Sequence, residues 1–265
     1  FKSAALSAIF DTFQTINSER AVFILPECFS EMNELNRIVE EVGKFQAKFY
    51  TFEELAKLFE SEEFDRFCFS KKASAFVPAC VFSFILSRGI QEIRNDFDDE
   101  KGTLFANQNN CSQELVNLMI SGKAVMNVHD RVMKVGGMDL KGIEKQGDIG
   151  FVSIYEAYND FRVGHFYKKP QYPAWVCYNE AHFTCLFGEP DILDSVLSGP
   201  IERFKESYCQ GLTKFIYFDG LHDQKVLYKI NVKYDGQKYV KKEYESYVEN
   251  LISTLIPGIE FDWNG

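Results

Sequence analysis

An apolar stretch in the first half of the chain constrains the fold more than any other feature of the sequence. Residues 73–87 carry no charged side chain, although Pro78 lies among them. A helix needs about 20 apolar residues to cross a bilayer, so this stretch is too short to span one. A helix drawn through residues 74–87 is apolar on nearly all faces, which predicts a central helix buried all round. No secretory signal is visible, and we expect no membrane partner.

The composition predicts that this helix belongs to a well-packed protein. The chain has 265 residues, is 46% hydrophobic and contains 26 phenylalanines, enough to fill one large core or two small ones. The formal net charge is -10 and the pI is about 5.0. An acidic chain repels phosphate backbones, and no basic stripe with interleaved aromatic residues occurs in the sequence. We therefore expect no nucleic-acid partner.

Helical periodicity dominates the chain up to about residue 122. Capping signals support this: Thr51 with Glu54 forms a capping-box pattern, Ser112 precedes a helical pattern, and Gly122 follows its end. We expect helices over residues 2–16, 30–42, 52–59, 74–87, 90–97 and 114–120, with strands over 21–25 and 45–49.

Strand patterns dominate from residue 123 onward. We expect a turn at Gly136 and Gly137, helices over residues 149–158 and 243–255, and strands over 174–178, 182–187, 214–218, 226–234 and 259–263. Helices followed by strands predict the α+β class. The helical half covers about residues 1–122, and a twisted, mostly antiparallel sheet covers about 123–265. We expect the two halves to form one domain over residues 1–265.

The cysteines predict a reducing compartment. Seven cysteines occur, at positions 28, 68, 80, 111, 177, 185 and 209, and no two have CxxC spacing. An odd, scattered set with members in apolar runs is typical of reduced, mostly buried thiols in a cytosolic or nuclear protein, and we expect a cytoplasmic one. The four histidines are not spaced as metal ligands, so we expect neither zinc nor another cofactor.

His182 is the candidate catalytic residue that the pattern itself offers. It stands at the entrance of a predicted strand, directly after the polar link 179–181. A cysteine protease places its general base in this way, opposite a thiol at a helix N-terminus. The alternative is a half-buried histidine that is hydrogen-bonded to a backbone carbonyl.

Two other segments favour structural roles. Lys123 follows Gly122, but the upstream glycines of a P-loop and the Ser or Thr after the lysine are missing, so nucleotide binding is not predicted. Asn127 and Asp130 are expected to form a tight turn through local side-chain hydrogen bonds. In residues 172–175, the proline is expected to start a strand and Trp175 to fill the core.

Short stretches between residue 75 and the end of the chain form a pattern. They are residues 84–90, 93–94, 121–125, 127–128, 130, 140–143, 149–151, 163–164, 172–176, 180–187, 218–221 and 263–265. Their order and spacing resemble the MINDY family of cysteine deubiquitinases, in the branch first described as a domain of unknown function. The resemblance implies a papain-like fold variant and hydrolysis of isopeptide bonds in lysine-linked polyubiquitin. It also implies that His182 is the catalytic histidine and that ubiquitin or polyubiquitin is the partner.

The chain departs from the family pattern in three places. The Gly-Gly-Pro-Cys-Gly type motif that carries the family's nucleophile does not occur; residues 1–16 resemble the following helix, so we expect the nucleophilic cysteine upstream of Phe1. Cys28 is a poor substitute because an acidic neighbour disfavours its thiolate. Cys177 and Cys185 are poor substitutes because no helix dipole would help them ionise. Arg131 stands where the family has glycine, and Asn179 where it has serine. The alternative is a catalytically silent pseudoenzyme that acts as a binding or structural module in a larger assembly.

Overall fold

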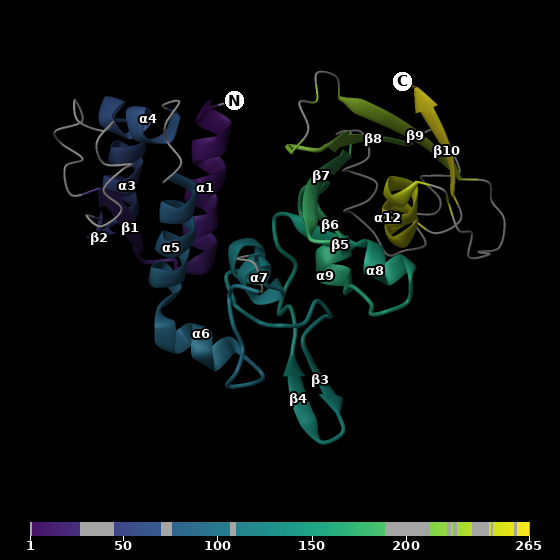
Figure 1. Cartoon of the computed structure of the whole chain (residues 1–265), viewed down its shortest axis with the longest axis horizontal. Coiled ribbons are helices and arrows are strands. Elements are labelled where there is room, and N and C mark those ends of the chain that lie inside the picture. The colour runs from purple at the N-terminus through teal and green to yellow at the C-terminus, as the bar shows by residue number, and fades with distance from the viewer. Residues whose placement is uncertain are drawn as a thin grey trace. The chain divides into compact units, whose positions relative to one another are not determined.

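The chain folds into two compact units, Phe1–Met126 and Asn127–Gly265 (Figure 1). The structure is a computed structural model, and it describes residues 2–26, 45–69, 76–106, 110–188, 213–221, 224, 227–234, 244, 246–256 and 259–264. Among the described residues each unit has its own buried hydrophobic cluster.

The first unit is mostly helical, as the sequence predicts. Its elements are α1 (Lys2–Ile16), β1 (Ala21–Pro26), β2 (Phe45–Tyr50), α3 (Phe52–Phe59), α4 (Glu62–Phe69), α5 (Phe76–Arg88), α6 (Ile90–Asp96) and α7 (Gln113–Ser121). The capping box of Thr51 and Glu54 is confirmed, as are the Ser112 cap and the left-handed Gly122 at the two ends of α7. The helix expected over residues 30–42 lies outside the described residues, and α4 was not predicted.

The central helix α5 is confirmed, but the prediction that it is buried all round is wrong. Ser83, Phe84 and Ile85 are buried, whereas the side chains of Val77 and Phe82 are 67% and 49% exposed. The apolar content of the helix therefore exceeds what its packed face needs. Among the described residues no single helix is long and apolar enough to cross a membrane. Helices α5 and α6 reach that length only together, with a bend of 79° between them.

Phenylalanine rings fill the core of the first unit. The rings of Phe13 and Phe84 lie 4.7 Å apart, and those of Phe59 and Phe64 stack at 4.6 Å. Phe23 of β1 contacts both groups, at 5.7 Å from Phe13 and 5.5 Å from Phe64. Tilted and edge-on ring pairs of this kind add attraction beyond the burial of apolar area. One aromatic core thus joins α1, β1, α3, α4 and α5.

Two serines of α5 form hydrogen bonds with the backbone of β1, on the edge that faces away from β2. The Ser87 hydroxyl accepts a hydrogen bond from the Val22 N–H at 2.8 Å and donates to the Val22 carbonyl at 3.2 Å. The Ser83 hydroxyl accepts from the Ile24 N–H at 2.9 Å. Among the described strands only β2 pairs with β1, along its other edge, so the two hydroxyls bind backbone groups that no described strand reaches.

The Ser87→Ala substitution is therefore expected to destabilise the first unit by about 1–3 kcal/mol, because it leaves two buried backbone groups of Val22 without a partner. Urea unfolding followed by circular dichroism measures the change. Ser7→Ala, at an exposed position of α1, is the control. Equal stability of the two variants would contradict the proposed role of the hydroxyl.

The second unit is built on a six-stranded sheet. Its elements are β3 (Val132–Val135), β4 (Met138–Lys141), β5 (Gly150–Ser153), α8 (Ile154–Ala157), α9 (His165–Lys168), β6 (Ala174–Asn179), β7 (His182–Gly188), β8 (Thr213–Phe218), β9 (Tyr228–Tyr234), α12 (Tyr247–Leu255) and β10 (Ile259–Asn264). The sheet order is β10-β9-β8-β7-β6-β5, and all neighbours are antiparallel except β5 and β6. The α+β class and the mostly antiparallel sheet are confirmed, while the papain-like topology stays a prediction.

Two helix predictions in this unit need correction. Residues 149–158 are not one helix, because β5 occupies residues 150–153 and pairs with β6 before the four-residue helix α8 begins. All four residues of β5 are buried, and a fully buried strand lacks the alternation that distinguishes it from a helix in sequence. Ser153 then caps α8 by accepting from the Tyr155 N–H. Helix α12 begins at Tyr247, four residues later than expected.

Helix α12 covers one face of the sheet (Figure 1). Val248, Leu251 and Ile252 of the helix are buried in one cluster with strand residues such as Trp175 and Ile230. The expectation that Trp175 fills the core is confirmed. Strands β3 and β4 form a separate hairpin through the predicted turn at residues 136–137, and both glycines there have positive φ angles. The sheet and α12 thus form the scaffold that carries the candidate site.

Candidate active site

The β6–β7 hairpin places His182 at the first position of β7, as predicted. Asn179 and His182 are the last paired residues, so Glu180 and Ala181 alone form the turn. Their φ angles are 46° and 66°, which is the left-handed geometry of a two-residue hairpin turn. Non-glycine residues adopt this conformation at a cost of about 1–2 kcal/mol each. A strained, tight turn therefore fixes where His182 begins its strand.

His182 faces a carboxylate that the sequence pattern did not identify. Its Nε2 atom lies 3.0 Å from Oδ1 of Asp219, and the two side chains are 30% and 10% exposed. In the sequence, Asp219 stands only within the stretch 218–221 that resembles the family, directly after the strand predicted over residues 214–218. That position is the signal from which the pair could have been found, because this strand pairs with β7. The pair has the arrangement in which a carboxylate orients an imidazole ring.

Asp219 is fixed by its own loop. Its Oδ1 atom also accepts from the Leu221 N–H at 3.0 Å, which closes a local turn. The Asp219 N–H donates to Oε1 of Gln224 at 2.8 Å, and Nε2 of Gln224 donates to the Tyr217 carbonyl at 3.1 Å. Both the backbone and the side chain of Asp219 are therefore held in place.

A buried tyrosine links this region to α12. The hydroxyl groups of Tyr217 and Tyr247 are hydrogen-bonded to each other. Burial is the main cause that raises the pKa of Tyr217, so the phenol stays neutral. Tyr217 thus joins β8, two residues before Asp219, to the first residue of α12.

Four of the described cysteines are poorly suited to act as nucleophiles. Cys177 and Cys185 lie on the strands next to His182, and burial raises the pKa of both thiols. Burial also raises the pKa of Cys111, and that of Cys80 to about 12. Since the thiolate is the reactive form, these groups are inert at neutral pH. Cys28 and Cys209 lie outside the described residues.

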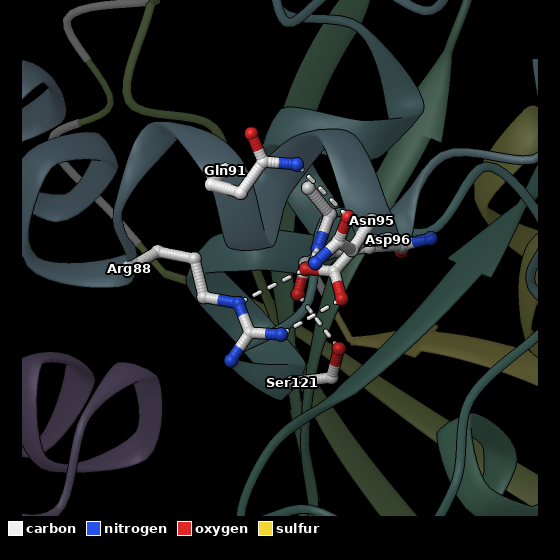
Figure 2. A network of polar contacts seen from close by, with 7 residues as sticks. Arg88, Gln91, Asn95, Asp96 and Ser121 are labelled. Carbon is white, nitrogen blue, oxygen red and sulfur yellow. Dashed lines mark hydrogen bonds and ion pairs between the residues drawn. The ribbon is translucent and has the colours of Figure 1, made fainter. Parts of the chain in front are cut away.

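A second polar centre lies in the first unit, in segments that carry the family resemblance (Figure 2). Arg88 and Asp96 form a two-pronged ion pair, at 3.0 Å from Nε and 2.7 Å from the terminal nitrogen, and their side chains are 17% and 8% exposed. Asp96 also accepts from the Ala124 N–H at 3.0 Å. Figure 2 shows the hydroxyl of Ser121 pointing toward the same cluster. The pair ties the end of α5 and α6 to the segment after α7, which is a structural role.

Asn127 and Asp130 have long-range partners rather than only the expected local turn. The Asn127 amide donates to the Lys141 carbonyl at 2.9 Å. The Asp130 carboxylate accepts from the N–H groups of His165 and Phe166, both at 2.9 Å, and so caps the start of α9. Arg131 has a φ of 59°, which explains why glycine suits this position in the family pattern.

No group of three or more His, Cys, Asp or Glu side chains in the described part of the chain is arranged to hold a metal ion. Near His182, the described residues offer acid–base chemistry through one imidazole and one carboxylate.

Ala181→Gly is expected to stabilise the second unit by about 0.5–1 kcal/mol. Glycine relieves the left-handed strain, and the greater flexibility of the unfolded chain offsets part of that gain. The change in urea midpoint measures it. Ala8→Gly, at an exposed site within α1, should have the opposite sign because glycine weakens a helix. Destabilisation by both variants would argue against strain in the turn.

Comparison with known proteins places the chain in a family. The family model described as "Deubiquitinating enzyme MINDY-3/4, conserved domain" matches residues 2–265. The proteins named probable ubiquitin carboxyl-terminal hydrolase MINDY-4 from Mus musculus and Homo sapiens are 37% and 34% identical over 193 residues, which is 69% of this chain and 24% of each relative. The protein named ubiquitin carboxyl-terminal hydrolase MINDY-3 from Xenopus tropicalis is 38% identical over 108 residues, 40% of this chain and 24% of the relative.

The chain therefore matches about a quarter of the length of these curated relatives. No solved structure matches the chain. The full-length match to the family model and the identity to MINDY-4 proteins agree with the motifs identified from sequence. The chain belongs to the MINDY-3/4 family of deubiquitinating enzymes.

Proposed function

We propose that this chain is part of the catalytic region of a cysteine deubiquitinase, and that His182 is its general base. The proposed reaction is hydrolysis of isopeptide bonds in lysine-linked polyubiquitin, and a papain-like fold variant belongs to the same proposal. The observation that carries it is the 3.0 Å contact between His182 Nε2 and Asp219 Oδ1 at the entrance of β7. Family membership supports the substrate class.

In this proposal the two ring nitrogens of His182 have different tasks. Because Nε2 faces Asp219, proton transfer uses Nδ1, which takes the proton from a cysteine thiol. The thiolate attacks the carbonyl carbon of the isopeptide bond. The imidazolium, stabilised by the Asp219 carboxylate, then donates its proton to the lysine amine as the C–N bond breaks. Water, deprotonated by the same nitrogen, hydrolyses the resulting thioester.

The nucleophile in this proposal lies in sequence that precedes Phe1. Burial raises the pKa of the thiols of Cys177 and Cys185, the described cysteines on strands β6 and β7. A nucleophilic cysteine instead needs an electropositive, partly exposed setting such as a helix N-terminus. The proposed active site is completed by a thiol of that kind beside His182.

The same observation supports a second candidate, a pseudoenzyme that binds ubiquitin or another protein without cleaving it. In that case the His182–Asp219 pair is a structural contact, and the domain works as a module in a larger assembly. The raised pKa values of the cysteines near His182 favour this reading if no other thiol reaches the histidine.

A ubiquitin probe with a thiol-reactive group at its C-terminus separates the two candidates. We expect the full-length protein to form a covalent adduct, and peptide mass spectrometry to locate the adduct on a cysteine before residue 1 of this chain. Polyubiquitin cleavage by the same preparation should follow. A folded protein that binds ubiquitin but neither reacts nor cleaves would support the pseudoenzyme. An adduct on one of the seven cysteines of this chain would refute the upstream nucleophile.

A further inference from the structure

We propose that Gln224 is a positioning residue for the candidate site: its side-chain amide fixes Asp219 against His182. This inference rests on the proposed function, since it concerns the same histidine. The hydrogen bonds of Gln224 lie where the ladder between β8 and β9 ends, next to the contact between Asp219 and His182.

Asp219 lies just beyond the regular pairing of β8. On one side the ladder with β9 ends at the pair Tyr217 and Tyr228, and on the other the ladder with β7 ends at Cys185 and Phe218. The regular pairing of β8 with its two neighbours therefore stops just before Asp219. A segment that leaves a sheet in this way normally gains freedom, which would let the carboxylate drift from the imidazole.

The side chain of Gln224 forms hydrogen bonds with the backbone of β8 at the point where the ladder ends. Its Oε1 atom accepts from the Asp219 N–H at 2.8 Å, and its Nε2 atom donates to the Tyr217 carbonyl at 3.1 Å. A neighbouring strand would supply this same combination of one acceptor and one donor. The Asp219 side chain is then fixed by the Leu221 N–H, so that Oδ1 stays 3.0 Å from His182 Nε2.

The arrangement requires a group that both accepts and donates. A neutral amide does this, and so does a protonated carboxylic acid, whereas a carboxylate can only accept. In a Gln224→Glu variant, the carboxylate would face the Tyr217 carbonyl and lie near the Asp219 charge. Both effects favour the protonated form and raise the pKa of the introduced group. The contact should therefore be lost at high pH and restored as the pH falls through that pKa.

The test uses the full-length protein and polyubiquitin cleavage as a function of pH. At pH 8 we expect Gln224→Glu and Gln224→Met to lower kcat by about 10- to 100-fold with little change in KM, since small misplacement of a catalytic group costs about this much. The activity of Gln224→Glu relative to the unmodified protein should recover as the pH falls toward 6. Gln224→Met should show no recovery, because it has neither a donor nor an acceptor. Gln91→Glu, at an exposed site of α6, is the control.

A second measurement does not depend on turnover. With isotope-labelled histidine, the Nε2-bound proton of His182 should give a downfield resonance that is sharp in the unmodified protein and broadened in Gln224→Met. Loss of activity in Gln224→Glu without recovery at low pH, together with an unchanged resonance, would overturn the inference. If His182→Ala leaves cleavage intact, the proposed function fails, while the resonance still tests whether Gln224 fixes the contact.

Discussion

His182→Ala is expected to lower kcat/KM for polyubiquitin cleavage by about 10²- to 10⁴-fold in the full-length protein, the range that general acid–base catalysis contributes. Alanine removes the group that takes the thiol proton and returns it to the lysine amine. The fold should survive, because the His182 side chain is 30% exposed and lies at the start of β7 rather than in the core. Initial rates at several substrate concentrations measure the loss.

His165→Ala is the matched control for this variant. The side chain of His165 is exposed at the start of α9, and its contact with Asp130 is made by the backbone N–H, which alanine retains. Its activity should stay within about twofold of the unmodified protein, as for other exposed positions without special contacts. Equal activities of the two histidine variants would remove His182 from the mechanism.

Asp96→Ala is expected to destabilise the first unit by about 3–5 kcal/mol, the largest stability effect that the structure predicts. The substitution leaves the largely buried Arg88 guanidinium without its carboxylate and the Ala124 N–H without its acceptor. With a typical slope of about 1–3 kcal/mol per molar urea, the midpoint should fall by more than about 1 M. Urea titration of the purified chain measures it.

Two further variants separate the buried charge from a general effect of mutation. The double variant Arg88→Met with Asp96→Leu should be more stable than Asp96→Ala, because it removes both charges instead of isolating one. Asp139→Ala breaks the exposed ion pair in which Lys134 Nζ lies 3.8 Å from Asp139 Oδ1. This variant should leave the free energy of unfolding almost unchanged. A double variant less stable than Asp96→Ala would contradict the isolated Arg88 charge as the cause of the loss.

Local signals in the sequence predicted most elements of the fold. The capping box at Thr51, the Ser112 and Gly122 caps, and the strand entrance at His182 each depend on a few neighbouring residues, and each is confirmed. The predicted burial of α5 on all sides and the helix over residues 149–158 were wrong. In both cases the apolar residues show no periodicity. The sequence therefore does not indicate which face of α5 is packed, or that residues 150–153 form a strand.

The candidate site could be predicted only in part, because its second member is distant in sequence. Asp219 lies 37 residues after His182, and only the pairing of β7 with β8 brings the two together. Asp130 shows the same limit, since it caps a helix that begins 35 residues later. A pattern of neighbouring residues contains no information on which strand edges will meet. Family resemblance marked the Asp219 segment without giving its role.

The contact between α5 and β1 also affects how this protein behaves at high concentration. Strand β1 has the sequence Ala-Val-Phe-Ile-Leu-Pro, which is uncharged and rich in residues that favour intermolecular β-structure. An open edge on such a strand is a template for another molecule to add to. The hydroxyls of Ser83 and Ser87 occupy that edge from within the same chain. Helix α5 therefore protects the first unit against aggregation as well as closing its core.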